Sequence, residues 1–371
     1  MKKQTGQIDK QMLAITLCLL GFGLLGLYSA STVQSFQIFG NTTHYILHQI
    51  IYGGILGLLA LYACSKIDYH FWQKNLPWLI FLSLFLLALV KVPGLSVSAG
   101  GASRWIQYGP ISFQPAELAK LVIIFYLASW AERKQNSLNN FYFGVLPSLI
   151  IVGLFALLVI WQPDMGTMLV LVAVALAMLF AGGINYKHLS LTILAGLITL
   201  YGIVKIAPYR AQRLTTFFDR SIDPKGISYQ INQALLAIGS GGFFGYGYGL
   251  SRQKHNYLPQ VMGDSVFAIT AEELGFLGAA VMVLLFCLFA LKGYRVAKRA
   301  PDLFGKMAAF GITSWIIIQA IINIAAMVHL LPLTGIPLPF FSYGSTALIM
   351  ILGAVGILLN ISKQSTGRSA I

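Results

Sequence analysis

The chain has 371 residues, of which 57% are hydrophobic and only 10% are charged, and its formal net charge is +14. A soluble globular domain of this size needs far more charge on its surface, so the composition excludes that class. The apolar residues come in blocks of roughly 20, the length at which a helix spans a bilayer. The alternation of a membrane β-barrel, in segments of about 10 residues, is absent. The sequence therefore predicts an all-α polytopic membrane protein.

Ten such blocks predict about ten transmembrane helices, which form a single integral membrane domain over residues 1–371. Between the third and fourth blocks lies a Gly/Ser-rich loop, and between the seventh and eighth lies one long loop, about 207–263. The blocks lie at about 11–31, 46–64, 76–92, 116–131, 143–161, after Asp164 to Gly183, 189–206, 264–291, 307–328 and 346–361.

The distribution of Lys and Arg predicts the orientation. Most of these residues lie in the N-terminal tail, in the connections after blocks 2, 4, 6 and 8, and in the C-terminal tail. The positive-inside rule places these segments in the cytoplasm, so both termini are expected there. The loop 207–263 is then extracytoplasmic. Its cations, among them Arg210, Arg213 and Lys254, are available for an anionic ligand.

The uncharged part of this long loop reads GISYQINQALLAIGSGGFFGYGYGLS. Its first half has helical spacing of apolar residues over Tyr229–Ile238, and its second half is rich in glycine. We expect a surface-lying or re-entrant segment, covered by protein wherever its backbone is not helical. The glycines do not form a nucleotide-binding loop, because no Gly-Lys-Ser/Thr follows them.

Asp264 stands where this loop meets the eighth apolar block. A carboxylate at a membrane boundary is costly to desolvate and therefore marks a functional site. The preceding cations Arg252 and Lys254 indicate an anionic substrate at the membrane surface. We expect structural roles for Glu272 and Glu273, in pairs with a buried cation.

Four further residues have both a structural and a functional interpretation. Asp164 begins a helix in WQPDMGT, where it acts as an N-cap or as a site residue. Glu117 and Lys120 are three residues apart on one helix, and form a structural ion pair or part of a site. Arg104 is an interfacial anchor or an anion ligand. The three Cys lie in apolar blocks and the six His lack metal-ligand spacing, so no metal site is predicted.

Several motifs, in order along nearly the whole chain, resemble the SEDS family of FtsW, RodA and SpoVE proteins. The Gln-Lys…Tyr-Leu-Pro motif is more similar to FtsW and SpoVE than to RodA. VMGDS and SYGST depart from common family forms, but Asp264 itself is present. The matching pieces are GASRWIQYGPISFQPAELAK, PDMGT, APYRAQRL, DPKGISYQINQALLAIGSGGFFGYGYG, SRQKHNYLP, DSVFAITAEELGFLG and NIAAMVHLLPLTGIPLPFFSYGST.

The resemblance implies a peptidoglycan glycosyltransferase that polymerises lipid II on the outer face of the bacterial cytoplasmic membrane, in cell division or shape maintenance. The donor carries a polyprenyl pyrophosphate, and the anomeric carbon is inverted. Asp264 is the expected catalytic base. The expected substrate-binding residues, mostly cations for the pyrophosphate, are Arg104, Lys120, Glu117, Arg210, Arg213, Lys254 and Asp164.

The resemblance also implies a partner, a class B penicillin-binding protein with transpeptidase activity, besides the surrounding membrane lipids. No nucleic acid is expected to bind. No cofactor is identified, and the sequence leaves open whether a divalent cation, Mg or Mn, shares the charge of the pyrophosphate. Two other functions are alternatives: a lipid II flippase, which ten spans and intramembrane charges suit, and a non-catalytic scaffold for a transpeptidase.

Overall fold

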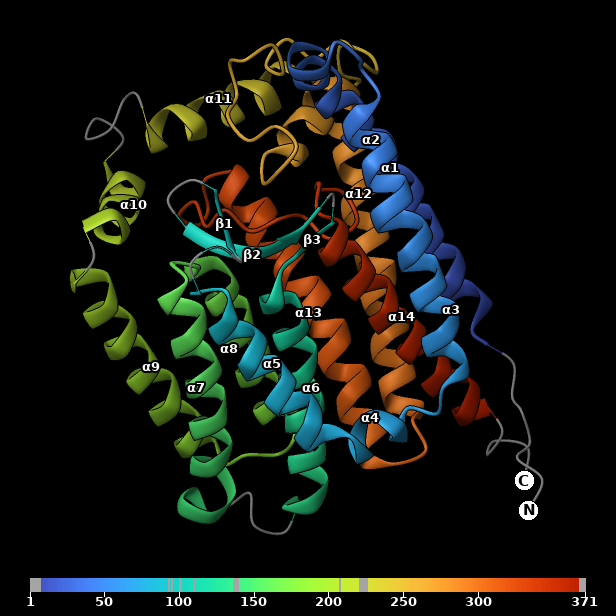
Figure 1. Cartoon of the computed structure of the whole chain (residues 1–371), viewed down its shortest axis with the longest axis vertical. Coiled ribbons are helices and arrows are strands. Elements are labelled where there is room, and N and C mark those ends of the chain that lie inside the picture. Colours follow the sequence, from blue (N-terminus) through green and yellow to red (C-terminus); the bar gives the residue numbers. More distant parts are fainter. Residues whose placement is uncertain are drawn as a thin grey trace.

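A computed structural model describes residues 8–92, 94, 96–99, 102–109, 111–135, 140–206, 208–219 and 226–366. It is a helical bundle with a small sheet near one end (Figure 1). The helices are α1 (Lys10–Phe39), α2 (His44–His48), the π-helical η1 (Gln49–Ile55), α3 (Leu56–Lys66), α4 (His70–Lys74), α5 (Leu76–Leu89), α6 (Pro115–Arg133), the π-helical η3 (Phe141–Val145), α7 (Leu146–Trp161), α8 (Met165–Ala181), α9 (Tyr186–Ile206), α10 (Pro208–Phe218), α11 (Ile227–Ser240), α12 (Val266–Arg299), α13 (Leu303–Met327) and α14 (Ser345–Thr366).

All ten predicted blocks are helical, which confirms the all-α polytopic fold. In the described part of the chain, 7 helical stretches are long and apolar enough to cross a membrane. The helices α5 and α8 are apolar but shorter. The remaining block, the fourth in chain order, is α6, which carries Glu117 and Lys120 near its start. The count of ten crossings itself stays a prediction.

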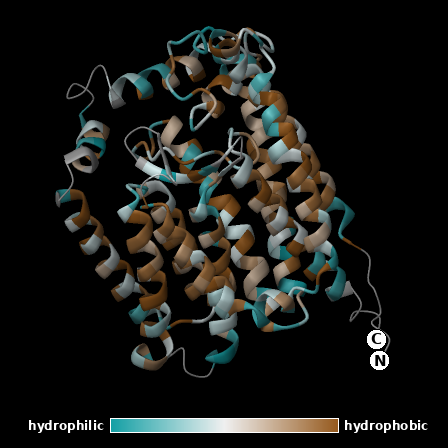
Figure 2. Ribbon diagram, viewed as in Figure 1, coloured by the Kyte–Doolittle hydropathy of each residue, from teal (hydrophilic) through white to brown (hydrophobic). Residues whose placement is uncertain are grey.

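Different connections and chain termini lie at the two ends of the bundle. The backbone N–H of Asp9 donates to Ser362 Oγ (3.4 Å), so the start of α1 lies beside the end of α14. The connection between α12 and α13 and the short helix α4 lie at this same end (Figure 1). Hydrophobic residues dominate the helices between the two ends (Figure 2). The segments predicted to be cytoplasmic therefore gather at one end, opposite the sheet and α11.

The helices α13 and α14 form the centre of the bundle, with 72% and 83% of their most apolar windows buried. Glycine allows α13 to approach its neighbours, because a Cβ on Gly311 would lie 2.6 Å from Met178 Sδ of α8 and 2.7 Å from Ile124 Cγ2 of α6. By contrast, none of the corresponding window of α9 is buried. This helix lies at the outer edge of the bundle (Figure 1).

The Gly/Ser-rich loop contains an antiparallel sheet that was not predicted. Its order is β1-β2-β3, built from Ser96–Ala99, Ala102–Tyr108 and Ile111–Phe113. Val97 pairs with Trp105, and Ile106 pairs with Phe113. The strand signal in this loop is the enrichment of Trp, Ile and Tyr in SRWIQY, followed by a Gly-Pro turn sequence. The sheet places Arg104 near the start of α8.

The predicted helical spacing over Tyr229–Ile238 corresponds to α11, and the glycine-rich segment behind it packs on a break in α12. The break lies at Gly275, whose φ is 66°. Four backbone hydrogen bonds replace those that the helix loses there, as expected for irregular backbone at membrane depth. They run from Tyr246 N to Glu272 O (3.1 Å), Gly247 N to Glu273 O (2.9 Å), Phe276 N to Gly242 O (2.9 Å) and Leu277 N to Phe243 O (3.2 Å).

Close approach explains why this segment is rich in glycine. A Cβ on Gly241 would lie 2.2 Å from the carbonyl oxygen of Ala271, and a Cβ on Gly245 would lie 2.1 Å from that of Glu273. Any side chain at either position would collide with the backbone of α12. The glycines therefore serve helix–loop packing.

Candidate functional site

Asp264 lies on the turn directly before α12, and its side chain is buried. Its Oδ1 accepts hydrogen bonds from Gln230 Nε2 of α11 (3.1 Å) and from Ser265 Oγ (3.4 Å). Its backbone carbonyl accepts from Asn323 Nδ2 of α13 (2.9 Å). Three elements, α11, α12 and α13, therefore fix the position of one carboxylate.

The connection between α13 and α14 holds the same turn. Asn323 Nδ2 also donates to the carbonyl of Ile336 (2.8 Å), so one amide bridges the connection and Asp264. Two further bonds tie the residues before Asp264 to it. They run from Ser342 Oγ to Gly263 O (2.6 Å) and from Tyr343 N to Met262 O (2.8 Å). The carboxylate is consequently preorganised by main-chain and side-chain contacts.

The side chains of Arg213 of α10 and Asp264 both lie beside Gly335. Arg213 Nη1 donates to the carbonyl of Leu333 (3.1 Å). A Cβ built on Gly335 would lie 3.9 Å from Asp264 Oδ2 and 3.9 Å from both terminal nitrogens of Arg213. The structure thus brings together two predicted site residues, a carboxylate and a guanidinium, which come from opposite ends of the long loop.

Burial raises the pKa of Asp264 from 3.8 to about 6. The charge of Arg213 and the hydrogen bonds from Gln230 and Ser265 lower this pKa, but they do not outweigh the loss of water. A carboxylate with this pKa is ionised at neutral pH and is a stronger base than an exposed aspartate.

Arg104 and Asp164 form a second pair, between β2 and the start of α8. Asp164 Oδ1 accepts from Thr167 N (3.0 Å) and Oδ2 accepts from Thr167 Oγ1 (2.8 Å), so the N-cap interpretation is confirmed. Arg104 Nε lies 3.9 Å from Asp164 Oδ2, and its Nη2 donates to the carbonyl of Pro163. An additional role in substrate binding stays a prediction for both residues.

Glu117 and Lys120 form a buried ion pair in the first turns of α6. Lys120 Nζ lies 2.8 Å from Glu117 Oε1 and 2.8 Å from Gln319 Oε1 of α13. The ammonium also lies 4.9 Å from the centre of the Trp315 ring. Gln319 Nε2 donates to the carbonyl of Pro337 (2.9 Å). The pair therefore supports the connection that flanks Asp264, and direct contact with substrate stays a prediction.

Lys254 is buried at the break of α12. Its Nζ donates to Glu273 Oε1 (3.0 Å), to Ser29 Oγ of α1 (3.0 Å) and to the carbonyl of Gly249 (2.7 Å). All three protons of the ammonium are thereby used within the protein. The expected pairing of Glu273 with a buried cation is confirmed. The structure favours a structural role for Lys254 over the predicted contact with substrate.

With this geometry described, comparison with known proteins decides the family. The family model for FtsW, RodA and SpoVE, described as cell cycle protein, matches residues 10–367. The chain belongs to the FtsW/RodA/SpoVE family. It is 42% identical over 357 residues to stage V sporulation protein E of Bacillus subtilis (strain 168), with 96% of this chain and 97% of that protein covered. The resemblance found in the sequence is confirmed.

A second relative has a name that includes an activity. The chain is 39% identical over 362 residues to a probable peptidoglycan glycosyltransferase FtsW of Geobacter sp. (strain M18), with 97% and 98% of the two chains covered. One of these relatives is a SpoVE protein and the other is an FtsW protein. This agrees with the similarity of the Gln-Lys…Tyr-Leu-Pro motif to FtsW and SpoVE.

Solved structures share the fold. The crystal structure of the rod shape determining protein RodA of Thermus thermophilus superposes with a TM-score of 0.70 at 26% identity, covering 96% of each chain. A chain of a peptidoglycan synthase complex superposes with a TM-score of 0.80 at 24% identity, covering 96% of this chain and 98% of that one. The helical arrangement is therefore that of the FtsW/RodA/SpoVE family.

Within this family fold, the remaining predicted residue is Arg210. It belongs to α10, but its side chain lies outside the described part of the structure, so its role stays a prediction. Three residues at the site were missed in the sequence: Gln230, Asn323 and Gly335. For Gln230 and Asn323 a signal was available, because an amide in an otherwise apolar segment must find a buried partner.

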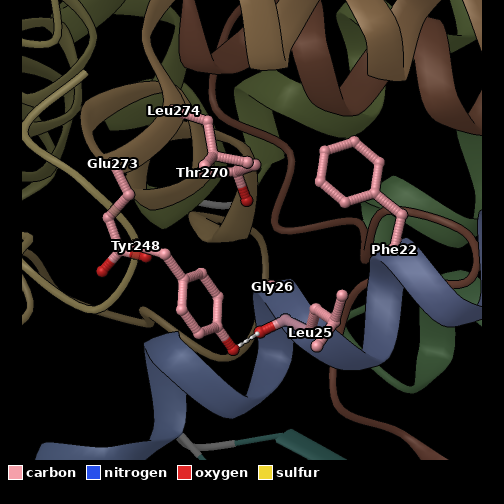
Figure 3. A pocket seen from close by; sticks show the side chains of 7 residues that line it. All are labelled: Phe22, Leu25, Gly26, Tyr248, Thr270, Glu273 and Leu274. Carbon is pink, nitrogen blue, oxygen red and sulfur yellow. Dashed lines mark hydrogen bonds between the residues drawn. The ribbon is translucent and has the colours of Figure 1, made fainter. Parts of the chain in front are cut away.

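A cavity of about 230 Å³ lies apart from Asp264, between α1 and α12 (Figure 3). Its wall is mostly apolar and includes Phe22, Leu25 and Leu274. Tyr248 closes one side and donates from its hydroxyl to the carbonyl of Leu25 (2.9 Å). In the described part of the chain none of the predicted site residues lines this cavity, so it is separate from the candidate site.

Among the described residues, no group of three or more His, Cys, Asp or Glu could hold a metal ion. The participation of Mg or Mn stays a prediction.

Proposed function

We propose that this protein is a peptidoglycan glycosyltransferase that polymerises lipid II at the outer face of the cytoplasmic membrane. The observation that carries the proposal is the buried Asp264 carboxylate, held on Oδ1 by Gln230 and lying with the Arg213 guanidinium beside Gly335. The name of the FtsW relative supports the activity. The basic connections at the opposite end of the bundle support the orientation.

In the proposed reaction, the acceptor sugar hydroxyl gives its proton to Asp264 while its oxygen forms a bond to the anomeric carbon of the donor. The bond from that carbon to the pyrophosphate oxygen breaks, and the electron pair leaves with the polyprenyl pyrophosphate. Attack from the side opposite the leaving group inverts the anomeric carbon. A pKa of about 6 suits a base that is ionised near neutral pH.

The leaving pyrophosphate needs positive charge, which usually supplies a large part of the catalysis. Arg213 is one candidate, because a guanidinium has five N–H donors and can serve the pyrophosphate as well as a neighbouring group. Arg210, three residues earlier on α10, and Arg104 on β2 are further candidates. Lys120 and Glu117 are proposed to support the site through Gln319 and the α13–α14 connection.

The proposed partner is a class B penicillin-binding protein that crosslinks the new strands. A chain with this fold forms part of a peptidoglycan synthase complex in which polymerization and crosslinking are coordinated. The helix α12 exposes large apolar residues, such as Leu284 and Leu291, that a membrane-embedded partner could cover. Co-purification from native membranes tests this; an active protein that never associates with such a transpeptidase contradicts it.

The activity is tested with purified protein and lipid II in detergent. Glycan chains support the proposal, provided that they are absent with Asp264→Asn prepared in the same way. Movement of labelled lipid II across liposomes without glycan formation would instead identify a flippase. Absence of both activities, with the transpeptidase still bound, would indicate a scaffold.

A further inference from the structure

Gly335 lies beside the two charged groups of the candidate site. Its φ is +71°, and the Cβ that it lacks would lie at 3.9 Å from Asp264 Oδ2 and from both terminal nitrogens of Arg213. These distances are ordinary van der Waals contacts. The absence of a side chain therefore leaves a notch whose walls are a carboxylate oxygen and a guanidinium.

The two oxygens of Asp264 are not equivalent. Gln230 Nε2 and Ser265 Oγ both donate to Oδ1. Oδ2 is the oxygen on the side of Gly335. Proton transfer to Asp264 in a bound complex requires a donor within hydrogen-bond reach of one of its oxygens, and the notch gives access to Oδ2.

We propose that Gly335 determines how the acceptor binds, because the notch left by its missing side chain receives the acceptor hydroxyl of the sugar between Asp264 Oδ2 and Arg213. This inference rests on the proposed glycosyltransferase function and adds a subsite to it. The hydroxyl donates to Oδ2, and the guanidinium donates to the oxygen of the same hydroxyl. A group with one donor and one acceptor is what these two walls can bind.

Backbone strain is the competing reason for a glycine here, because a positive φ disfavours most residues. Asparagine separates the two explanations, since it tolerates the left-handed conformation but fills the notch. Gly40 is the matched control, with a φ of +67° and, in the described part of the chain, nothing within 4 Å of an added Cβ. Gly40→Asn thus makes the same change at the same φ without filling a site.

The experiment compares lipid II polymerisation by the parent, Gly335→Asn, Gly335→Ala, Gly40→Asn and Asp264→Asn, each purified and checked by thermal melting. We expect Gly335→Asn to lose about 10²-fold in rate, as for a misplaced reacting group. Gly335→Ala should lose less, and Gly40→Asn should stay within about threefold of the parent. Labelled lipid II should still bind to Gly335→Asn, because the cations proposed for the pyrophosphate, Arg104, Arg210 and Arg213, are all retained.

The outcomes separate this inference from the proposed function. If the parent polymerises, Asp264→Asn is inactive and Gly335→Asn keeps the parent rate, the notch assignment is overturned and the function stands. Equal losses in Gly335→Asn and Gly40→Asn also overturn it, in favour of strain. If Gly335→Asn does not fold, Gly335→Ala decides, and a parent-like rate refutes the notch. No glycan from the parent refutes the function itself.

Discussion

The ionisation of Asp264 should govern how polymerisation depends on pH. Its burial raises its pKa to about 6, and the proposed base is active only when deprotonated. The rate should therefore fall as the pH drops through about 6, rather than near 4 as for an exposed aspartate. Initial rates between about pH 5 and pH 8 measure this. A rate that is constant down to about pH 5 would argue against Asp264 as the base.

Gln230 should shift this pH dependence, because its hydrogen bond to Oδ1 stabilises the ionised carboxylate. Gln230→Met keeps the bulk of the side chain and removes the donor, so the acid limb of the rate profile should move to higher pH. Gln233→Met, a half-buried glutamine on the same helix, is the control and should leave the limb in place. Identical profiles for both variants would exclude Gln230 from setting the pKa.

At the level of single residues, the sequence predicted the charged members of the site better than their neighbours. Asp264 and Arg213 stand out in the sequence because charged residues beside apolar blocks are costly to desolvate and therefore indicate a function. Gly335 could not be predicted, because its importance depends on two side chains that the fold brings to it from 71 and 122 positions away. The ion-pair partner of Lys254 could not be predicted either, because Glu273 lies on the following helix. Contact of Lys254 with substrate stays a prediction.

At the level of helices and strands, apolar blocks of bilayer length predicted the helices well, since each block must satisfy its backbone internally. The break in α12 was not predictable from the run ELGFLGAA, because isolated glycines in an apolar run are compatible with a straight helix. The hydrogen-bonding partners of the break lie about 30 positions earlier, in the segment after α11. The sheet was not predicted, because its strands are short and lie in a loop that is rich in Gly and Ser.

Lys254→Met tests the structural role of the ion pair at this break. The change leaves the Glu273 carboxylate buried without its cation, which typically costs about 3–5 kcal/mol. The melting temperature should therefore fall. The double variant Lys254→Met with Glu273→Gln should recover most of the lost stability. A single variant that has the melting temperature of the parent, but uses lipid II poorly, would instead identify Lys254 as a substrate ligand.

For the whole molecule, the distribution of basic residues fixes the expected orientation, and labelling can test it. In a variant without the three native cysteines, a cysteine at the exposed Arg299 should resist an impermeant thiol reagent on intact cells. A cysteine at the exposed His255, near Asp264 in sequence, should react readily. The reverse pattern would place Asp264 in the cytoplasm and contradict synthesis at the outer face.

The central claim is that Asp264 is the base of a peptidoglycan polymerase, and Asp264→Asn tests it most directly. The raised pKa means that the ionised carboxylate destabilises the folded protein above about pH 6, so the amide should fold at least as well as the parent. The measurement is glycan formation from lipid II by equal amounts of the two purified, folded proteins. We expect a loss of about 10²–10⁴ in rate, with a melting temperature at least as high as that of the parent. Polymerisation by Asp264→Asn at near the parent rate would contradict the account.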